Sequence, residues 1–169
     1  MIINPYAIKK QEYLGENYPI ANQDVSLTMY FGNAEGYAQG VITPAGGWTI
    51  SSLEFYMFAV GSPPGSIQFG VYSDSSGPVT PVIAQVSMNA SELTGTYARY
   101  KRELLSPVVL TGSTVYYFGV RYAAGDGSNA VVVGANTAGG YSGGTMYRLV
   151  SGAWGARTED IIFYSYRVD

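Results

Sequence analysis

Apolar and polar positions alternate along much of the chain and predict a protein built from β-strands. Within residues 66–73 the side chains of Ile67, Phe69 and Val71 occupy every second position, which is the period of a strand with one buried face. A Ser-Pro-Pro-Gly turn precedes this run and an Asp-Ser-Ser-Gly-Pro turn follows it. Because no segment repeats apolar residues with the helical period, we expect an all-β fold.

Turns rich in Gly, Pro and Asn divide the chain from residue 36 onward into short strands. We expect strands at 36–43, 48–60, 66–73, 82–88, 97–105, 114–123, 130–135, 141–150 and 160–168, with one helical turn near 89–93. Eight to ten short strands with such turns are typical of a jelly roll. The sequence therefore predicts a jelly-roll β-sandwich of two antiparallel sheets over residues 36–169.

The first 35 residues follow a different pattern. Pro5 and Pro19 interrupt any period, and apolar positions are isolated, apart from one short candidate strand at 25–31. We expect residues 1–35 to form an extended N-terminal arm or strap. Such an arm is ordered by packing on its own domain or on a neighbour, and the sequence leaves both alternatives open.

Two of the expected strands carry large apolar side chains on both faces. The alternation that places residues 53, 55 and 57 in the core turns the residues between them outward, and the same holds around residues 161 and 163. A strand that is apolar on both faces is ordinarily covered on both, and a bare patch is unusual in a monomer. We therefore predict a homo-oligomer, for example a trimer, with a protein interface formed by Tyr56, Phe58, Ile162, Tyr164 and Tyr166.

The chain has no cysteine and no histidine, which excludes most familiar catalytic and metal sites. Disulfides, thiolate nucleophiles and zinc–cysteine sites need cysteine, and the usual general base near neutral pH is histidine. The remaining candidates for acid–base chemistry are the carboxylates Glu54, Asp74, Asp126, Glu159 and Asp160. Their spacing marks out no glycosidase-like pair. We expect no enzymatic activity and no cofactor.

Calcium is the metal that the oxygen-rich loops of this chain would suit best. Asp74 and Asp126 lie beside glycines in loops, but neither loop has the dense Asp/Asn pattern of a calcium site. Aspartate in such a position commonly bonds its own backbone to form a turn. The prediction is therefore plain turns and no metal.

Charge is sparse and tyrosine is abundant. Charged residues make up 12% of the chain, the net charge is −3, and there are 16 Tyr and 22 Gly. Few phosphate counterions could be released by such a surface, so nucleic-acid binding is not expected. No run of 18 apolar residues is present to span a membrane. A tyrosine-rich, charge-poor surface suits neutral partners such as sugars or protein faces, although tyrosine is also simply common in strands.

Sugar binding would use exposed aromatic rings with polar groups beside them. Trp154 lies in a glycine-flanked loop, and Tyr141 and Tyr147 precede it on the neighbouring expected strand. We predict carbohydrate binding by Trp154, Tyr141 and Tyr147, with the alternative that Trp154 folds back as a cap on the core. Trp48 begins an expected strand and is assigned to the core.

Several segments in order carry a resemblance to a known family. These are TISSLEFYM, VGSPPGSIQFGVYSDSSGP, SPVVLTGSTVYYFGVRY, GGYSGG, SGAW and DIIFYSY, which together span about residues 37–166. The chain resembles jelly-roll surface modules of tailed-phage virion proteins and secreted bacterial proteins, and MIINPY resembles the start of some short phage structural proteins.

The resemblance implies a non-enzymatic virion surface protein, such as a capsid decoration or fibre-like subunit. It would act through contacts with copies of itself and with other virion proteins. The alternative is a carbohydrate-binding module or adhesin domain, extracellular or on a cell surface, with surface glycans as partners. The turn motifs specify the fold more closely than the function, because similar jelly rolls serve several functions.

Overall fold

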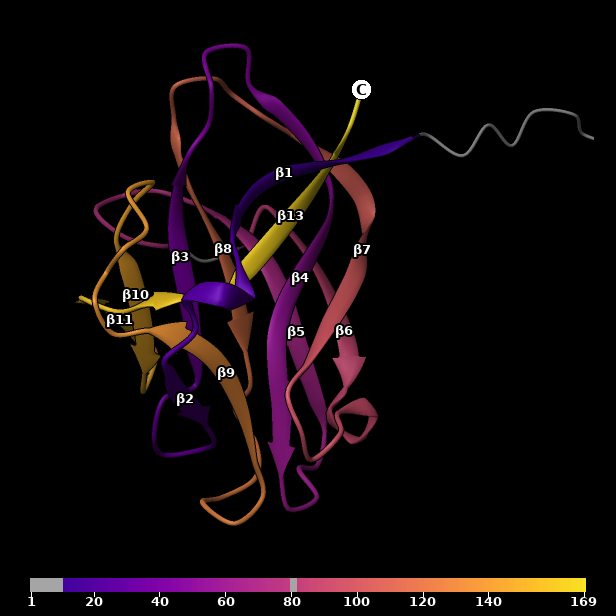
Figure 1. Ribbon diagram of the computed structural model, residues 1–169, viewed down its shortest axis with the longest axis vertical. Coiled ribbons are helices and arrows are strands. Elements are labelled where there is room, and N and C mark those ends of the chain that lie inside the picture. Colours follow the sequence, from indigo (N-terminus) through magenta and orange to yellow (C-terminus); the bar gives the residue numbers. More distant parts are fainter. Residues whose placement is uncertain (1–10, 80–81) are drawn as a thin grey trace, which may run out of the picture.

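Two antiparallel β-sheets pack face to face in the computed structural model, which describes residues 11–79 and 82–169 (Figure 1). The predicted all-β sandwich is confirmed. The first sheet contains β1 (Glu12–Tyr18), β2 (Val25–Met29), β4 (Trp48–Val60), β7 (Ala98–Leu110), β9 (Ala130–Asn136), β12 (Asp160–Ile161) and β13 (Phe163–Val168). The second sheet contains β3 (Gly36–Ile42), β5 (Ser66–Ser73), β6 (Ala84–Asn89), β8 (Val115–Arg121), β10 (Met146–Val150) and β11 (Ala153–Arg157).

The strand order is that of a jelly roll. From β2 to β9 the chain passes back and forth between the sheets, and only β5 and β6 follow each other within one sheet. Strands β2, β9, β4 and β7 are neighbours in the first sheet, and β3, β8, β5 and β6 are neighbours in the second. The hairpin β10–β11 extends the second sheet beyond β3, while β13 pairs with β4 on one side and β1 on the other.

The core lies between the sheets and follows the alternation seen in the sequence. Ile67, Phe69 and Val71 are fully buried. Rings from opposite sheets meet there: Phe69 lies 5.2 Å from Phe55, and Phe118 lies 6.1 Å from Phe163 between ring centroids. These contacts join strands of opposite sheets, so burial of apolar area holds the two sheets together.

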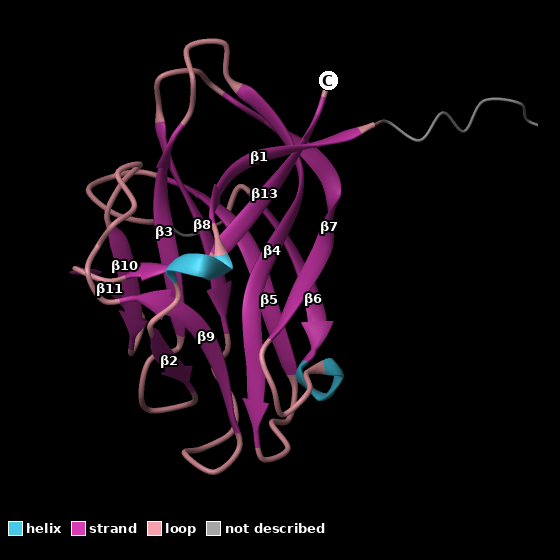
Figure 2. Ribbon diagram, in the orientation of Figure 1, coloured by secondary structure: helices cyan, strands magenta, loops and turns pink. Residues whose placement is uncertain are grey.

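Helix is confined to two short 3-10 segments in the described residues (Figure 2). One is η1 (Ile20–Asn22), and the other is η2 (Ala90–Glu92), where a helical turn was predicted. Asn89 caps η2 by accepting a hydrogen bond from the backbone N–H of Ser91 at 3.0 Å, while Glu92 accepts one from the N–H of Asn89 at 2.9 Å. In residues 11–79 and 82–169, no helix has the length and apolar character needed to cross a membrane.

The described part of the N-terminal segment packs on its own domain. β1 pairs with β13 and crosses it near the C-terminus (Figure 1), and β2, the predicted strand at 25–31, pairs with β9. Residues 1–10 of the expected arm lie outside the described residues. Of the two alternatives left open by the sequence, packing on its own sandwich holds for residues 12–29.

A partly buried polar contact holds the start of β1. The Glu12 carboxylate accepts hydrogen bonds from the hydroxyls of Ser51 and Ser52 at 2.6 and 2.5 Å, and it pairs with Lys101. Burial raises the pKa of Glu12, but these hydrogen bonds and the Lys101 ammonium outweigh it and hold the pKa at about 2. The contact joins β1 to β4 and β7 across the outer face of the first sheet.

Candidate functional site

The residues predicted as a protein interface lie on the first sheet, and side chains of the same chain cover them. Tyr56 stacks on Tyr97 with ring centroids 4.7 Å apart, and Phe58 meets the edge of the same Tyr97 ring at 4.6 Å. Tyr97 comes from the connection before β7 and donates a hydrogen bond to Ser26 at 2.8 Å. Tyr56 and Phe58 are half-buried.

Tyr164 and Tyr166 are covered in the same way by η1 and by cations of β7. The Tyr164 hydroxyl accepts a hydrogen bond from the Ile20 N–H at 3.0 Å, and the Arg99 guanidinium lies 4.1 Å from the centre of the Tyr164 ring. The Lys101 ammonium lies 3.7 Å from the centre of the Tyr166 ring. The Tyr166 hydroxyl donates to Glu54 at 2.6 Å.

Ile162 is a correction to the predicted interface. It was expected to face outward, but it is fully buried and belongs to the main core. The alternation fails because the strand is interrupted here: β12 pairs with β9, β13 pairs with β4, and the Ile162 N–H donates to the Gly134 carbonyl at 2.8 Å between them. The apolar outer side of the first sheet, from which self-association was predicted, is thus shielded within one chain.

The residues predicted to bind carbohydrate fall in two places. Trp154 and Tyr147 share the outer face of the second sheet, where both are half-buried. Tyr141 does not join them. Its ring packs against Tyr18 at 5.7 Å and Phe163 at 5.4 Å, beside the main core. Sequence proximity placed Tyr141 near Trp154, but the fold separates them.

Three cross-strand rows build the outer face of the second sheet. One row runs Trp154, Leu149, Gly36, Arg121, Gln68 and Ser87 from β11 to β6. The next runs Ala156, Tyr147, Ala38, Gly119, Gly70 and Gln85, and the third holds Gly40, Tyr117 and Tyr72. We call this surface the aromatic face, defined by Tyr72, Tyr117, Tyr147, Trp154, Arg121 and Gln68.

Glycines in the middle row provide the floor on which the rings lie. A Cβ atom on Gly119 would lie 3.0 Å from the Tyr72 ring and 2.9 Å from the Ala38 Cβ. A Cβ atom on Gly70 would lie 3.1 Å from the same ring. The Tyr72 ring therefore lies close over β5 and β8 because these two positions carry no side chain.

Two aromatic pairs form the layer above this floor. Trp154 meets Tyr72 edge-on at 5.6 Å, and Tyr147 meets Tyr117 edge-on at 5.3 Å. Tyr72 and Tyr117 are buried beneath the half-exposed Trp154 and Tyr147. The Trp154 indole N–H finds no acceptor in the part of the chain that the structure describes. The indole ring packs against the cluster of Ala38, Tyr72 and Tyr117.

Asp74 holds the turn that borders the aromatic face. Its carboxylate accepts hydrogen bonds from the Gly77 N–H and the Tyr117 hydroxyl, both at 2.9 Å, and Tyr147 donates to the Ser76 carbonyl at 3.3 Å. Burial raises the pKa of Tyr117, and the hydrogen bond to Asp74 raises it further. The turn predicted for Asp74 is thus observed, with a second role in orienting Tyr117.

Asp126 also closes a turn, by accepting from the backbone N–H groups of Ser128 and Asn129 at 2.8 and 3.0 Å. Across residues 11–79 and 82–169, no group of three or more acidic side chains is placed to hold a metal ion.

The other acidic candidates serve separate contacts. Glu54 pairs with Arg99, and Glu159 pairs with Arg157, which lowers the pKa of the Glu159 carboxyl. Asp160 is buried and accepts hydrogen bonds from the Tyr141 N–H and the Gln39 side chain, both at 2.9 Å. Burial raises the pKa of Asp160 while these two bonds lower it.

Polar side chains continue the aromatic face toward the edge strand β6. Arg121 and Gln68 are register partners on β8 and β5, and Ser87 follows Gln68 on β6. The Gly36 position makes room for Arg121, because a Cβ atom there would lie 2.8 Å from the Arg121 Cγ. Burial raises the pKa of Tyr72 to about 12, although the nearby Arg121 lowers it.

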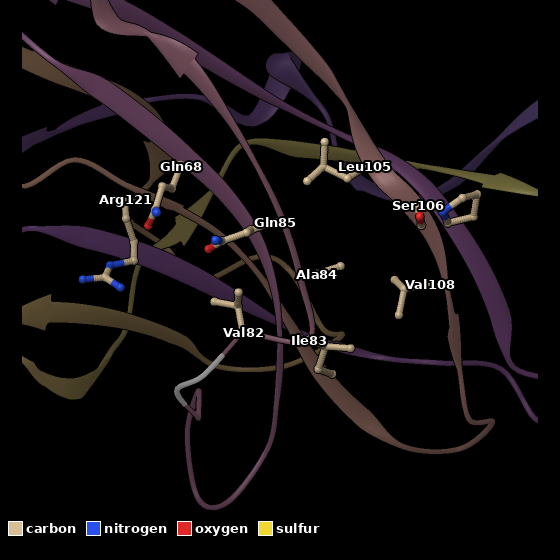
Figure 3. A pocket seen from close by; sticks show the side chains of 10 residues that line it. Gln68, Val82, Ile83, Ala84, Gln85, Leu105, Ser106, Val108 and Arg121 are labelled. Atoms are coloured by element: carbon tan, nitrogen blue, oxygen red, sulfur yellow. The ribbon is translucent and has the colours of Figure 1, made fainter.

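A cavity of about 650 Å³ borders this polar end, between the aromatic face and β7. Figure 3 shows Arg121, Gln68 and Gln85 at one end of it and Leu105, Ser106 and Val108 at the other. Between residues 103 and 108, β7 bulges away from β4, and Leu105 on this bulge is 87% exposed. A volume of this size falls in the range of small-ligand sites.

Neither a known protein family nor a curated protein matches the chain.

Tyr72, Tyr117, Arg121 and Gln68 are the members of the site that sequence reasoning missed. A signal was present: the alternation that buries Ile67, Phe69 and Val71 turns Gln68 and Tyr72 to the opposite side. The alternation does not reveal the strand order. That order places β8 beside β5 and separates β10 from β8 by β3 alone.

Proposed function

We propose that the protein is a non-enzymatic surface module that binds carbohydrate through the aromatic face. The observation that carries the proposal is the placement of half-exposed Trp154 and Tyr147 rings on the same face as Arg121 and Gln68. Aromatic rings offer apolar surface for the C–H faces of a sugar. Amide and guanidinium groups supply hydrogen bonds to its hydroxyls.

The build of the face supports a recognition role. The Tyr72–Trp154 and Tyr117–Tyr147 pairs fix the ring positions before a ligand arrives, so little side-chain freedom would be lost on binding. A surface or virion location for this module is proposed from the sequence resemblance over residues 37–166.

Replacing Trp154 by alanine tests the proposal. We expect the wild-type protein to bind members of a glycan array, and Trp154→Ala to weaken that binding at least tenfold in calorimetric titration, equal to about 1.4 kcal/mol. Phe31→Ala is the matched control, because Phe31 is 70% exposed and belongs to the β2–β3 connection. Binding by Trp154→Ala as tight as by the wild type, or an array without any binder, contradicts the proposal.

A second candidate function is assembly with further copies of this chain, as in a decoration or fibre-like subunit. The observation that favours it is the exposed apolar rim of β7, where Leu105 is 87% and Val109 is 78% exposed, with Ile83 nearby at 43%. Burying such side chains at an interface contributes about 25 cal/mol per Å² before ordering costs.

Sedimentation equilibrium tests the assembly. We expect a concentration-dependent oligomer for the wild type and a monomer for Leu105→Asp, because an interfacial carboxylate would be desolvated without a partner. Leu14→Asp is the control, since Leu14 is 53% exposed on β1. A wild-type monomer over the whole accessible concentration range would rule the assembly out.

A further inference from the structure

Arg121 differs from the cations of β7 in having no carboxylate partner. Arg99 pairs with Glu54, Lys101 with Glu12, and Arg102 with Glu92. Among the residues that the structure describes, no acidic side chain pairs with Arg121, and its buried Nε finds no acceptor. The Tyr72 hydroxyl lies next to the guanidinium, but a buried N–H such as the Arg121 Nε is costly to leave without an acceptor unless something supplies one.

The space around Arg121 is free of competing charge. Arg121 and Gln68 line both the 650 Å³ cavity and a neighbouring one of about 240 Å³ that also contacts Ser66. Within the described part of the chain, neither cavity is lined by an acidic residue, although the protein as a whole has a net charge of −3. An acid brought to this position would therefore meet one cation and no adjacent carboxylate.

Uncharged hydrogen-bonding groups stand beside the guanidinium. Gln68 is the register partner of Arg121, and Gln85 lines the cavity at the same end, while Ser106 lies at the opposite end (Figure 3). Amides both donate and accept, which suits the hydroxyls of a sugar. Val82 and Ile83 add apolar surface between these groups and β7.

From these observations we infer that the carbohydrate bound by this protein is acidic, with a sugar carboxylate held by the Arg121 guanidinium. The inference rests on the proposed function and narrows its ligand to one class. A planar guanidinium offers two parallel N–H donors that match both oxygens of a carboxylate, which an ammonium does not. Gln68 and Gln85 then bind hydroxyls of the same ring, and Trp154 and Tyr147 bind the neighbouring sugars along the aromatic face.

The test compares acidic oligosaccharides with their own neutral forms. The probes are oligosaccharides that carry galacturonate, glucuronate or sialic acid, each measured beside its carboxyl-reduced form, in which a hydroxymethyl group replaces the carboxylate. We expect the wild type to bind at least one acidic form at least tenfold more tightly than its reduced form. This preference should weaken as salt is added, because the charges lie near the surface.

Variants of Arg121 test whether this residue causes the preference for the acidic form. Arg121→Gln should bind the acidic and the reduced form with equal affinity, and Arg121→Lys should recover only part of the difference. Retained binding of the reduced form by Arg121→Gln shows that the aromatic face is intact. Arg167→Gln is the matched control, because it removes the same charge from β13 of the first sheet and should keep the full preference.

The outcomes separate the inference from the proposed function. Equal affinity of the wild type for acidic and reduced forms, with binding still lost in Trp154→Ala, overturns the inference and leaves carbohydrate binding in place. A preference that survives in Arg121→Gln also overturns the inference. Failure of the wild type to bind either form of any probe overturns the inference and counts against the proposed function.

Discussion

Replacing Gly119 by valine is expected to lower the free energy of unfolding by about 2–3 kcal/mol, the usual cost of forcing extra atoms into a packed site. Gly119 lies at the centre of the floor beneath the aromatic layer. Its Cβ would meet the Ala38 Cβ at 2.9 Å, and the Tyr37 carbonyl oxygen and the Tyr72 ring at 3.0 Å each. Two of these neighbours belong to β3 and cannot yield without disturbing the sheet.

The same substitution should weaken carbohydrate binding, because lifting the Tyr72 ring displaces Trp154 above it. Chemical denaturation gives the change in stability, and titration of the folded variant gives the change in affinity. Gly155→Val on β11 is the matched control, since a Cβ atom at Gly155 meets no atom within 4 Å. Equal stability of Gly119→Val and the wild type would show that the glycine floor is not needed to seat the rings.

Replacing Asp160 by alanine is expected to destabilise the protein by about 2–4 kcal/mol, since two buried donors lose their acceptor. Asp160 accepts from the Tyr141 N–H and from Gln39, and the Gln39 side chain also donates to the Gly144 carbonyl at 2.7 Å. Gln39 is fully buried between the sheets, so its lost hydrogen bond is not readily replaced. Chemical denaturation at neutral pH measures the loss.

Asp160→Asn is the control that separates the acceptor from the charge. It keeps one oxygen for Gln39 and should cost less than the alanine variant. Burial raises the pKa of Asp160, and its hydrogen bonds lower it by less, so the pKa in the folded protein lies above the ordinary 3.8. The native state therefore holds the proton more tightly than the unfolded chain does. Wild-type stability should therefore fall, relative to the asparagine variant, as the pH rises from the ordinary pKa of 3.8 through the raised pKa of the folded state. If the stability of the wild type relative to Asp160→Asn stayed constant or rose with pH, this account of the buried carboxylate would be contradicted.

Local alternation was sufficient to predict the fold. The two-residue period around Ile67, Phe69 and Val71, and the glycine and proline turns between such runs, depend on near neighbours in the chain. The predicted strands at 48–60 and 66–73 coincide with β4 and β5, and the helical turn near 89–93 contains η2. Strand pairing over long distances then follows the jelly-roll order, one of few ways to close so many short strands.

The cover of the first sheet could not be predicted in the same way. Tyr56, Tyr164 and Tyr166 are correctly placed on the outer side. Tyr97 reaches Tyr56, η1 reaches Tyr164 and Arg99 reaches Tyr166 from distant parts of the sequence. The period also predicts an uninterrupted strand at 160–168, but the structure breaks the strand at Ile162. Long-range contacts and strand breaks are decided by tertiary packing, which a two-residue period does not contain.

The candidate site was predictable only in part for the same reason. Trp154 stood out in the sequence because glycine follows it, and Tyr147 because it lies on the preceding expected strand. In the structure Leu149, two residues after Tyr147, pairs with Trp154. The alternation turns Gln68 outward, but nothing in the sequence marked Gln68 or Arg121 as part of a site, since one arginine or glutamine on a strand is ordinarily a solvated side chain. The pairing of β8 with β5 places Arg121 beside Gln68 on the aromatic face.

Nuclear magnetic resonance titration of the ¹⁵N-labelled protein with an oligosaccharide that it binds tests the central claim most directly. The account predicts that backbone and indole signals shift for the outward residues of the second sheet, above all Trp154, Tyr147, Arg121 and Gln68. Signals of the outer face of the first sheet, such as Tyr56 and Tyr164, should stay in place. Shifts confined to the first sheet, or none at saturating oligosaccharide, would contradict the assignment of carbohydrate binding to the aromatic face.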